Sequence, residues 1–202
     1  MKDVGIFGGS FNPIHYGHLR LAEYFVNSGR VDEVWLLVSP QNPLKERGML
    51  LDASFRLELA RAAVSGHAGI EASDFEFSLP LPSYTWRTLR ALTEAYADCR
   101  FSLIIGADNW ARFDRWARHD EILARYPLLI YPREGYPIDA TTLPQGVSLA
   151  QAPLFPYSST EVREQIRRGA PLTDMIPTCV VSLLRQHGYY TPRPASSAAS
   201  PR

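Results

Sequence analysis

The residues best suited to chemistry in this chain are two histidines near its N-terminus, in the sequence His15-Tyr16-Gly17-His18. Each neutral imidazole carries one N–H donor, so the pair offers two donors to a single phosphate group. The glycine between them lets a nucleotide lie close to the backbone. Two alternatives stay open: ordinary capping or core histidines, and a zinc site, although no third ligand follows at a matching helical spacing.

The segment before the histidine pair is rich in glycine and follows the first apolar run, in GIFGGSFNPIHYGH at 5–18. Gly8 and Gly9 allow a sharp turn and bring backbone N–H groups close to an anion, to which a following helix adds its positive dipole end. The spacing matches neither Gly-x-x-x-x-Gly-Lys-Ser/Thr nor Gly-x-Gly-x-x-Gly. The loop is therefore predicted to bind phosphate without belonging to either common class.

A second cluster lies far along the chain, where Ser158-Ser159-Thr160 precedes Arg163 by one helical turn. A helix N-terminus with hydroxyls and a guanidinium is suited to polyphosphate. The alternative is an N-cap, with Ser159 as the capping residue, next to a surface arginine.

Hydrophobic patterning indicates the elements that must position these residues. Nearly continuous apolar runs predict strands buried on both faces, at 4–7, 33–39, 101–105 and 128–131. Helical patterns alternate with them, at 19–26, 55–64, 85–96, 159–169 and 177–187. This alternation predicts an α/β fold with a parallel sheet, in which the loop after the first strand lies at the edge that binds ligands.

Composition narrows the class of protein. The chain has 202 residues and a formal net charge of +0, so no global field attracts nucleic acid or a membrane. We expect one domain over 1–190, a frayed tail over 191–202, and neither a targeting segment nor a membrane span. The two cysteines fit neither a disulfide framework nor a zinc spacing, which favours the cytoplasm, and a homo-oligomer stays open.

Taken together, the two motifs resemble a known family. Ser10-Phe11-Asn12-Pro13 leading into His15-x-Gly17-His18, with Ser158-Ser159-Thr160-x-x-Arg163, is similar to the HxGH and SSTxxR motifs of the nucleotidyltransferase superfamily, and within it to bacterial nicotinate mononucleotide adenylyltransferases. The likeness runs from about residue 4 to about residue 190. It implies a Rossmann-like doubly wound sheet with C-terminal helices.

The resemblance also implies a reaction and a set of site residues. The implied reaction is adenylyl transfer from ATP to nicotinate mononucleotide in NAD biosynthesis, with Mg²⁺ on the phosphates and no metal ligand from the protein. His15, His18 and Arg163 take catalytic roles by this likeness. Its ATP-binding set is Gly8, Gly9, Ser10, Phe11, Gly106, Asp108, Ser158, Ser159 and Thr160.

The same resemblance assigns the mononucleotide site. Thr85 and Trp116 match segments that hold the pyridine ring and its carboxylate, and Lys45 matches a phosphate contact. An aromatic face suits a flat ring, although a core tryptophan is the alternative for Trp116. The chain departs from the family pattern twice, because the loop from Pro40 to Lys45 lacks a histidine and Ala117 follows Trp116 where an aromatic residue is common.

Several related functions remain as alternatives. Nicotinamide mononucleotide or phosphopantetheine could replace the acceptor, although phosphopantetheine adenylyltransferases normally have Thr at the place of His15. Cytidylyltransferases share the histidine pair but carry a different C-terminal signature. A non-catalytic nucleotide sensor is disfavoured because both histidines, the hydroxyls and Arg163 are present.

Overall fold

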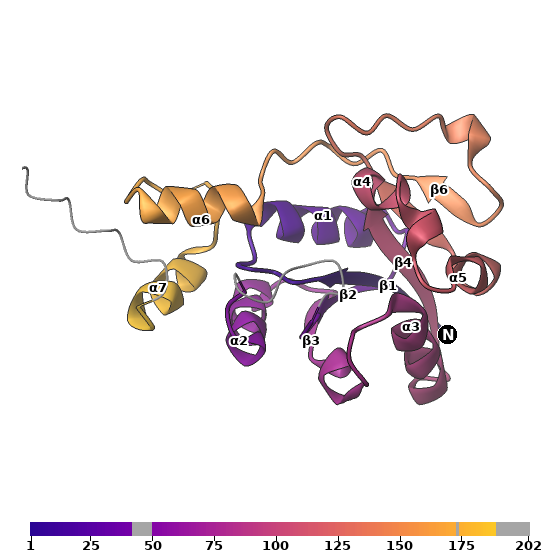
Figure 1. Ribbon diagram of the computed structural model, residues 1–202, viewed down its shortest axis with the longest axis horizontal. Coiled ribbons are helices and arrows are strands. Elements are labelled where there is room, and N and C mark those ends of the chain that lie inside the picture. The colour runs from indigo at the N-terminus through magenta and orange to yellow at the C-terminus, as the bar shows by residue number, and fades with distance from the viewer. Residues whose placement is uncertain (42–49, 173, 189–202) are drawn as a thin grey trace, which may run out of the picture.

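The computed structural model describes residues 1–41, 50–172 and 174–188. Within them, six parallel strands form one sheet in the order β3-β2-β1-β4-β5-β6 (Figure 1). The strands are β1 (Lys2–Gly9), β2 (Glu33–Val38), β3 (Ile70–Ser73), β4 (Cys99–Gly106), β5 (Leu128–Tyr131) and β6 (Val147–Leu149). The predicted α/β fold with a doubly wound parallel sheet is confirmed, and its strand order reverses between β1 and β4.

Helices connect the strands and cover both sides of the sheet, with α1 on one side and α3 on the other (Figure 1). The α-helices are α1 (Tyr16–Asn27), α2 (Ala53–Val64), α3 (Thr85–Ala95), α4 (Ala107–Trp110), α5 (His119–Arg125), α6 (Ser159–Arg167) and α7 (Thr178–Gln186). Short 3₁₀ helices are η2 (Phe75–Ser78), η3 (Phe113–Arg115) and η4 (Ala140–Thr142). Five of these helices agree with the sequence prediction to within a few residues at each end.

The core consists of two apolar layers, one on each face of the sheet. Alternate residues of β2 illustrate the division: Leu36 packs in the layer beneath α1 and α2, whereas Leu37 packs in the layer beneath α3 and α5. Because both faces are covered, the central strands are mostly apolar where they are buried, which explains their hydrophobic runs.

The structure contains elements that the sequence did not indicate. Some of the sequence predictions fall on residues that the structure does not describe. Strands β3 and β6 were not predicted. Lys45 and the predicted tail at 191–202 lie outside the described residues. None of the helices in the described part of the chain is long and apolar enough to cross a membrane.

Candidate active site

The two histidines of the first motif lie together at the start of α1. Their rings stack with centroids 3.6 Å apart and an interplanar angle of 26°. The backbone N–H of His15 donates to Nδ1 of His18 at 3.3 Å. Because Nδ1 accepts this bond, the proton of a neutral His18 lies on Nε2, which makes that nitrogen the donor.

Gly17 is required by this stack. A Cβ at this position would come within 3.0 Å of Cε1 and Nδ1 of His15. Real Cβ atoms rarely approach so closely, so a side chain here would push the His15 ring out of place. The glycine therefore makes room for the imidazole of His15.

His15 is the more deeply buried of the two histidines, with 4% of its surface exposed. Burial, together with the smaller effect of the positive charge of Arg133, lowers its pKa to about 3. His15 is therefore neutral at physiological pH and offers one N–H donor. Its Nδ1 makes no hydrogen bond within the described part of the chain.

The neutral state of His15 predicts acid sensitivity of the fold. An unfolded histidine binds a proton near pKa 6.5, whereas the buried ring does so only near 3. Between these values the unfolded state holds more protons, so the free energy of unfolding falls as the pH falls, by up to about 1.4 kcal/mol per pH unit from this residue. Urea unfolding at about pH 7 and about pH 5 measures the loss.

The matched variant for this measurement is His15→Asn, which removes the titrating ring. Its free energy of unfolding should depend less steeply on pH than that of the wild type over the same interval. Equal slopes in the two proteins would show that His15 does not remain neutral in the fold.

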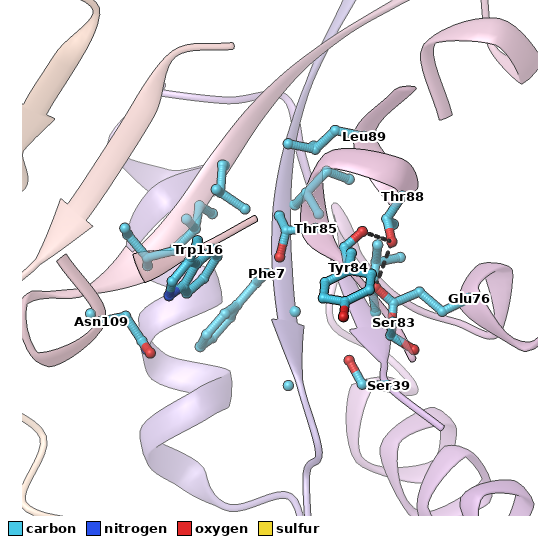
Figure 2. Close-up of a pocket in the computed structure, with 18 of the residues that line it drawn as sticks. Phe7, Ser39, Glu76, Ser83, Tyr84, Thr85, Thr88, Leu89, Asn109 and Trp116 are labelled. Carbon is cyan, nitrogen blue, oxygen red and sulfur yellow. Dashed lines mark hydrogen bonds between the residues drawn. The ribbon is translucent and has the colours of Figure 1, made fainter. Parts of the chain in front are cut away.

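Two cavities open at the carboxyl edge of the sheet, near the point where the strand order reverses between β1 and β4. The first, which we call the Trp116 cavity, is lined by Gly8, Ser83, Thr85, Glu76, Asn109 and Trp116, among others. The second, the histidine cavity, is lined by His15, His18, Asp108, Arg133, Tyr157 and Ser158, among others. In Figure 2, Trp116, Phe7 and Asn109 lie on one side of the Trp116 cavity, and Ser83, Tyr84 and Glu76 lie on the other.

Buried polar atoms that make no hydrogen bond are concentrated in these two cavities, although Asp108 Oδ1 forms an ion pair with Arg133. Five buried side-chain atoms in the described residues make no hydrogen bond, and every one belongs to a residue that lines a cavity. They are Glu76 Oε2, Ser83 Oγ and Trp116 Nε1 in the first cavity, and His15 Nδ1 and Asp108 Oδ1 in the second. Because an unsatisfied buried polar group is costly, both cavities are suited to polar ligands.

The second motif lies against the first, although about 140 residues separate them in the sequence. The hydroxyl of Ser159 donates to the carbonyl of Pro13 at 3.0 Å, and Nη1 of Arg163 donates to the carbonyl of Asn12 at 2.8 Å. Figure 1 shows α6 next to the start of α1. The structure therefore brings the two predicted motifs together.

One detail of the second motif differs from the sequence prediction. Ser158, and not Ser159, caps α6, because its hydroxyl accepts from the backbone N–H of Glu161 at 3.1 Å. Ser158 lines the histidine cavity, whereas the Thr160 hydroxyl accepts from Nη2 of Arg163 at 3.0 Å. Ser159, Thr160 and Arg163 are not among the cavity-lining residues.

Some residues of the glycine loop line a cavity, and others are buried beneath the histidine pair. Gly8 and Gly9 line the Trp116 cavity and not the histidine cavity. Ser10 and Phe11 are buried, and the ring of Phe11 packs edge-on against His18 with centroids 5.0 Å apart. Gly9 must lack a Cβ because one would lie 3.0 Å from the Phe11 ring.

The other predicted residues occupy the cavities as follows. Thr85 begins α3 and lines the Trp116 cavity together with Trp116 and Gly106. Asp108 lies in the first turn of α4, lines the histidine cavity, and pairs with Arg133 at 3.5 Å. Trp116 is therefore a cavity residue, although it also packs on the core residue Phe113 with centroids 5.3 Å apart.

Sequence reasoning missed several charged residues in these cavities, and Arg133 and Glu76 are two of them. Arg133, which follows β5, faces His15 and Asp108, and Glu76 from η2 accepts from the Thr88 hydroxyl at 2.9 Å. The sequence indicated Arg133 only weakly: it lies two residues beyond the strand predicted at 128–131, at the edge of the sheet that binds ligands. Nothing in the local sequence distinguished Glu76 from an exposed glutamate.

The histidine pair and the start of α6 meet near the point where the strand order reverses between β1 and β4. This combination is typical of a class of nucleotide-binding α/β proteins. The model of the cytidylyltransferase-like family matches residues 6–165. A solved structure with this fold is the Plasmodium falciparum nicotinic acid mononucleotide adenylyltransferase complexed with NaAD, at a TM-score of 0.78, 19% identity, and coverage of 94% of this chain and 98% of that one.

Curated relatives are closer in sequence. A Bacteroides fragilis protein named "Probable nicotinate-nucleotide adenylyltransferase" is 47% identical over 82% of this chain and 83% of its own length. A protein of the same name from Porphyromonas gingivalis is 45% identical over 86% of this chain and 89% of its own length. The chain therefore belongs to the cytidylyltransferase-like family, on the branch of the nicotinate-nucleotide adenylyltransferases, as the resemblance implied.

Proposed function

We propose that this protein transfers the adenylyl group of ATP to nicotinate mononucleotide, forming nicotinate adenine dinucleotide and pyrophosphate. The observation that carries the proposal is the pair of cavities, which adjoin at Phe7 and Tyr131 and offer different functional groups. The histidine cavity offers donors for phosphates, and the Trp116 cavity offers an aromatic wall for a pyridine ring. The names of the curated relatives support the same activity.

In this proposal ATP occupies the histidine cavity. The Asp108 carboxylate accepts hydrogen bonds, which suits the hydroxyls of the ATP ribose. His15, His18 and Arg133 present donors or positive charge to the phosphates. Arg163 donates to the Asn12 carbonyl and the Thr160 hydroxyl, and its guanidinium carries further N–H donors that suit a phosphate oxygen.

The mononucleotide occupies the Trp116 cavity. Ser83 Oγ and Trp116 Nε1 are buried donors that lack partners in the described residues, and they match the acceptor oxygens of a carboxylate or phosphate. The first turn of α3, at Thr85, adds backbone N–H groups and the positive end of an 11-residue helix. These donors favour an acid over an amide on the pyridine ring, whereas the Glu76 carboxylate in the same cavity opposes an acid.

The reaction needs alignment and charge stabilisation more than covalent help from the protein. An oxygen of the mononucleotide 5′-phosphate forms a bond to the α-phosphorus of ATP, and the bond from that phosphorus to the β-phosphate oxygen breaks, releasing pyrophosphate. Donors fixed before the reaction stabilise the charge that develops on the phosphate oxygens. Mg²⁺ is proposed to enter on the phosphates of ATP, as part of the substrate.

A pyrophosphate-release assay with a panel of acceptors tests the proposal. We expect kcat/KM for nicotinate mononucleotide to exceed that for the amide form by about tenfold or more, with no turnover of phosphopantetheine. Equal values for the acid and the amide would contradict the acceptor preference. Tight ATP binding without pyrophosphate release would favour a sensor, and undiminished turnover without Mg²⁺ would contradict the metal requirement.

Gly8 offers a specific test of the mononucleotide site. A Cβ built on Gly8 meets no atom of the described residues within 4 Å, so a side chain there extends into the Trp116 cavity. Gly8→Val should change the free energy of unfolding by no more than about 0.5 kcal/mol. It should raise KM for the mononucleotide by about tenfold or more and leave KM for ATP nearly unchanged. An equal increase in both KM values would contradict this placement of the substrates.

The compartment is proposed to be the cytoplasm. Cys99 and Cys179 are free thiols, as expected in a reducing environment. Cell fractionation followed by immunoblotting tests this assignment, and recovery in a membrane or periplasmic fraction would contradict it.

A further inference from the structure

The Trp116 cavity and the histidine cavity meet at two aromatic side chains. Phe7, near the carboxyl end of β1, and Tyr131, at the carboxyl end of β5, are the residues of the described chain that line both cavities. Their rings pack edge-to-face with centroids 5.8 Å apart. If each cavity holds one substrate, as proposed above, the new bond between the two phosphates forms beside this pair.

Tyr131 supplies the polar group at this junction. Phe7 has no polar atom in its side chain, so among the described residues that line both cavities only Tyr131 carries a hydrogen-bond donor. Phe7 also packs against His18, with ring centroids 6.0 Å apart. Tyr131 and His18 therefore both lie against the same phenylalanine ring, close to where the phosphates must meet.

The position of the Tyr131 hydroxyl is held by its neighbours. A Cβ built on Gly106 would lie 3.1 Å from Cζ and from the hydroxyl oxygen of Tyr131, so the phenol packs directly over this glycine. The Arg133 guanidinium lies over the ring, 5.4 Å from its centroid. Burial raises the pKa of Tyr131 to about 12, so the hydroxyl keeps its proton in neutral solution and remains a donor.

We propose that Tyr131 is a further catalytic residue of this active site, whose hydroxyl donates a hydrogen bond to a non-bridging oxygen of the reacting phosphates. The proton stays on the phenol throughout, so no proton transfer or covalent step is assigned to it. The hydroxyl complements the His18 donor by reaching the phosphates from the β5 side of the junction. This role rests on the proposed adenylyl transfer.

Tyr131→Phe isolates the hydroxyl, because it keeps the ring that packs on Phe7 and over Gly106. We expect kcat to fall by about 10- to 100-fold, with an unchanged melting temperature and with KM values for both substrates within about twofold of wild type. The matched control is Tyr126→Phe, whose hydroxyl contacts Thr93 at 3.1 Å and lines neither cavity. It should turn over like the wild type.

Tyr131→Leu removes both the hydroxyl and the aromatic ring, so comparison with Tyr131→Phe distinguishes the role of the hydroxyl from that of the ring as a wall between the cavities. If the ring alone matters, the leucine variant loses activity and the phenylalanine variant keeps it, which would overturn the proposal. A phenylalanine variant that loses activity together with its folded structure, as seen by circular dichroism, would also overturn it.

Binding of the dinucleotide product distinguishes failure of this proposal from failure of the proposed function. The product places its pyrophosphate at the junction, so calorimetry should find weaker binding of nicotinate adenine dinucleotide to Tyr131→Phe than to wild type. If the wild type neither forms nor binds this product, the proposed function fails. If the wild type does both and Tyr131→Phe matches it in each, only the role of Tyr131 fails.

Discussion

His18→Ala is expected to lower turnover by about 10²- to 10³-fold while the protein stays folded. The hydrogen bond from the His15 backbone fixes the tautomer of His18, so Nε2 presents its proton as a donor before the substrates bind. Packing against His15 and Phe11 holds the ring in one orientation, and this preorganisation is what an alanine removes. Pyrophosphate release under saturating substrates measures the loss, and circular dichroism measures the fold.

Two variants make the His18 result specific. His18→Gln keeps an N–H donor of similar reach and should recover part of the lost rate. His67→Ala removes a half-exposed histidine that pairs with Glu23 at 2.8 Å and lies in neither cavity, so its turnover should match the wild type. Wild-type turnover by His18→Ala would show that the histidine pair is not part of the chemistry.

Arg56→Met is expected to cause the largest loss of stability, on the order of 3 kcal/mol or more. Only 1% of Arg56 is exposed, and its guanidinium donates to four backbone carbonyls. These belong to Ser10 at 2.6 Å, Ser39 at 2.9 Å, Leu51 at 3.0 Å and Pro40 at 3.3 Å. Methionine fills much of the volume but leaves the carbonyls without these donors, and each unsatisfied carbonyl is costly.

The effect should extend to the active site, because Arg56 holds the loops that follow β1 and β2. The fraction of Arg56→Met that remains folded should therefore show a reduced kcat, because the loop that begins at Ser10 leads directly to the histidine pair. Arg61→Met on the same helix is the control, because Arg61 and its partner Asp74 are both about half exposed. We expect that variant to lose less than about 1 kcal/mol in urea unfolding. Similar losses in the two variants would contradict the role of Arg56.

Hydrophobic patterning predicted the elements with long apolar runs and missed the short ones. The four predicted strands, β2, β1, β4 and β5, are the inner strands of the sheet. Burial on both faces favours runs of consecutive apolar residues in them. Strands β3 and β6 are edge strands of four and three residues, with polar side chains among them. They are strands because their backbones pair with β2 and β5, and such pairing leaves no periodic signal in so short a segment.

Motif recognition named candidate site residues, and the structure divides them into two groups. His15, His18, Asp108, Thr85 and Trp116 line the two cavities, and their roles toward the substrates stay predictions. In a second group the present contacts are structural: Phe11 supports His18 from the core, and Ser159 and Arg163 bind loop carbonyls. Their assigned roles toward ATP stay predictions.

The sequence by itself determined the fold class, the family and the two motifs, because these depend on residue type and spacing along the chain. Only the tertiary structure decided that α6 docks on the loop after β1, that Arg56 binds the carbonyls of that loop, and that Tyr131 lies where the cavities meet. Each of these contacts joins residues far apart in sequence. Local propensity does not encode such pairings, which arise when the two core layers close around the sheet.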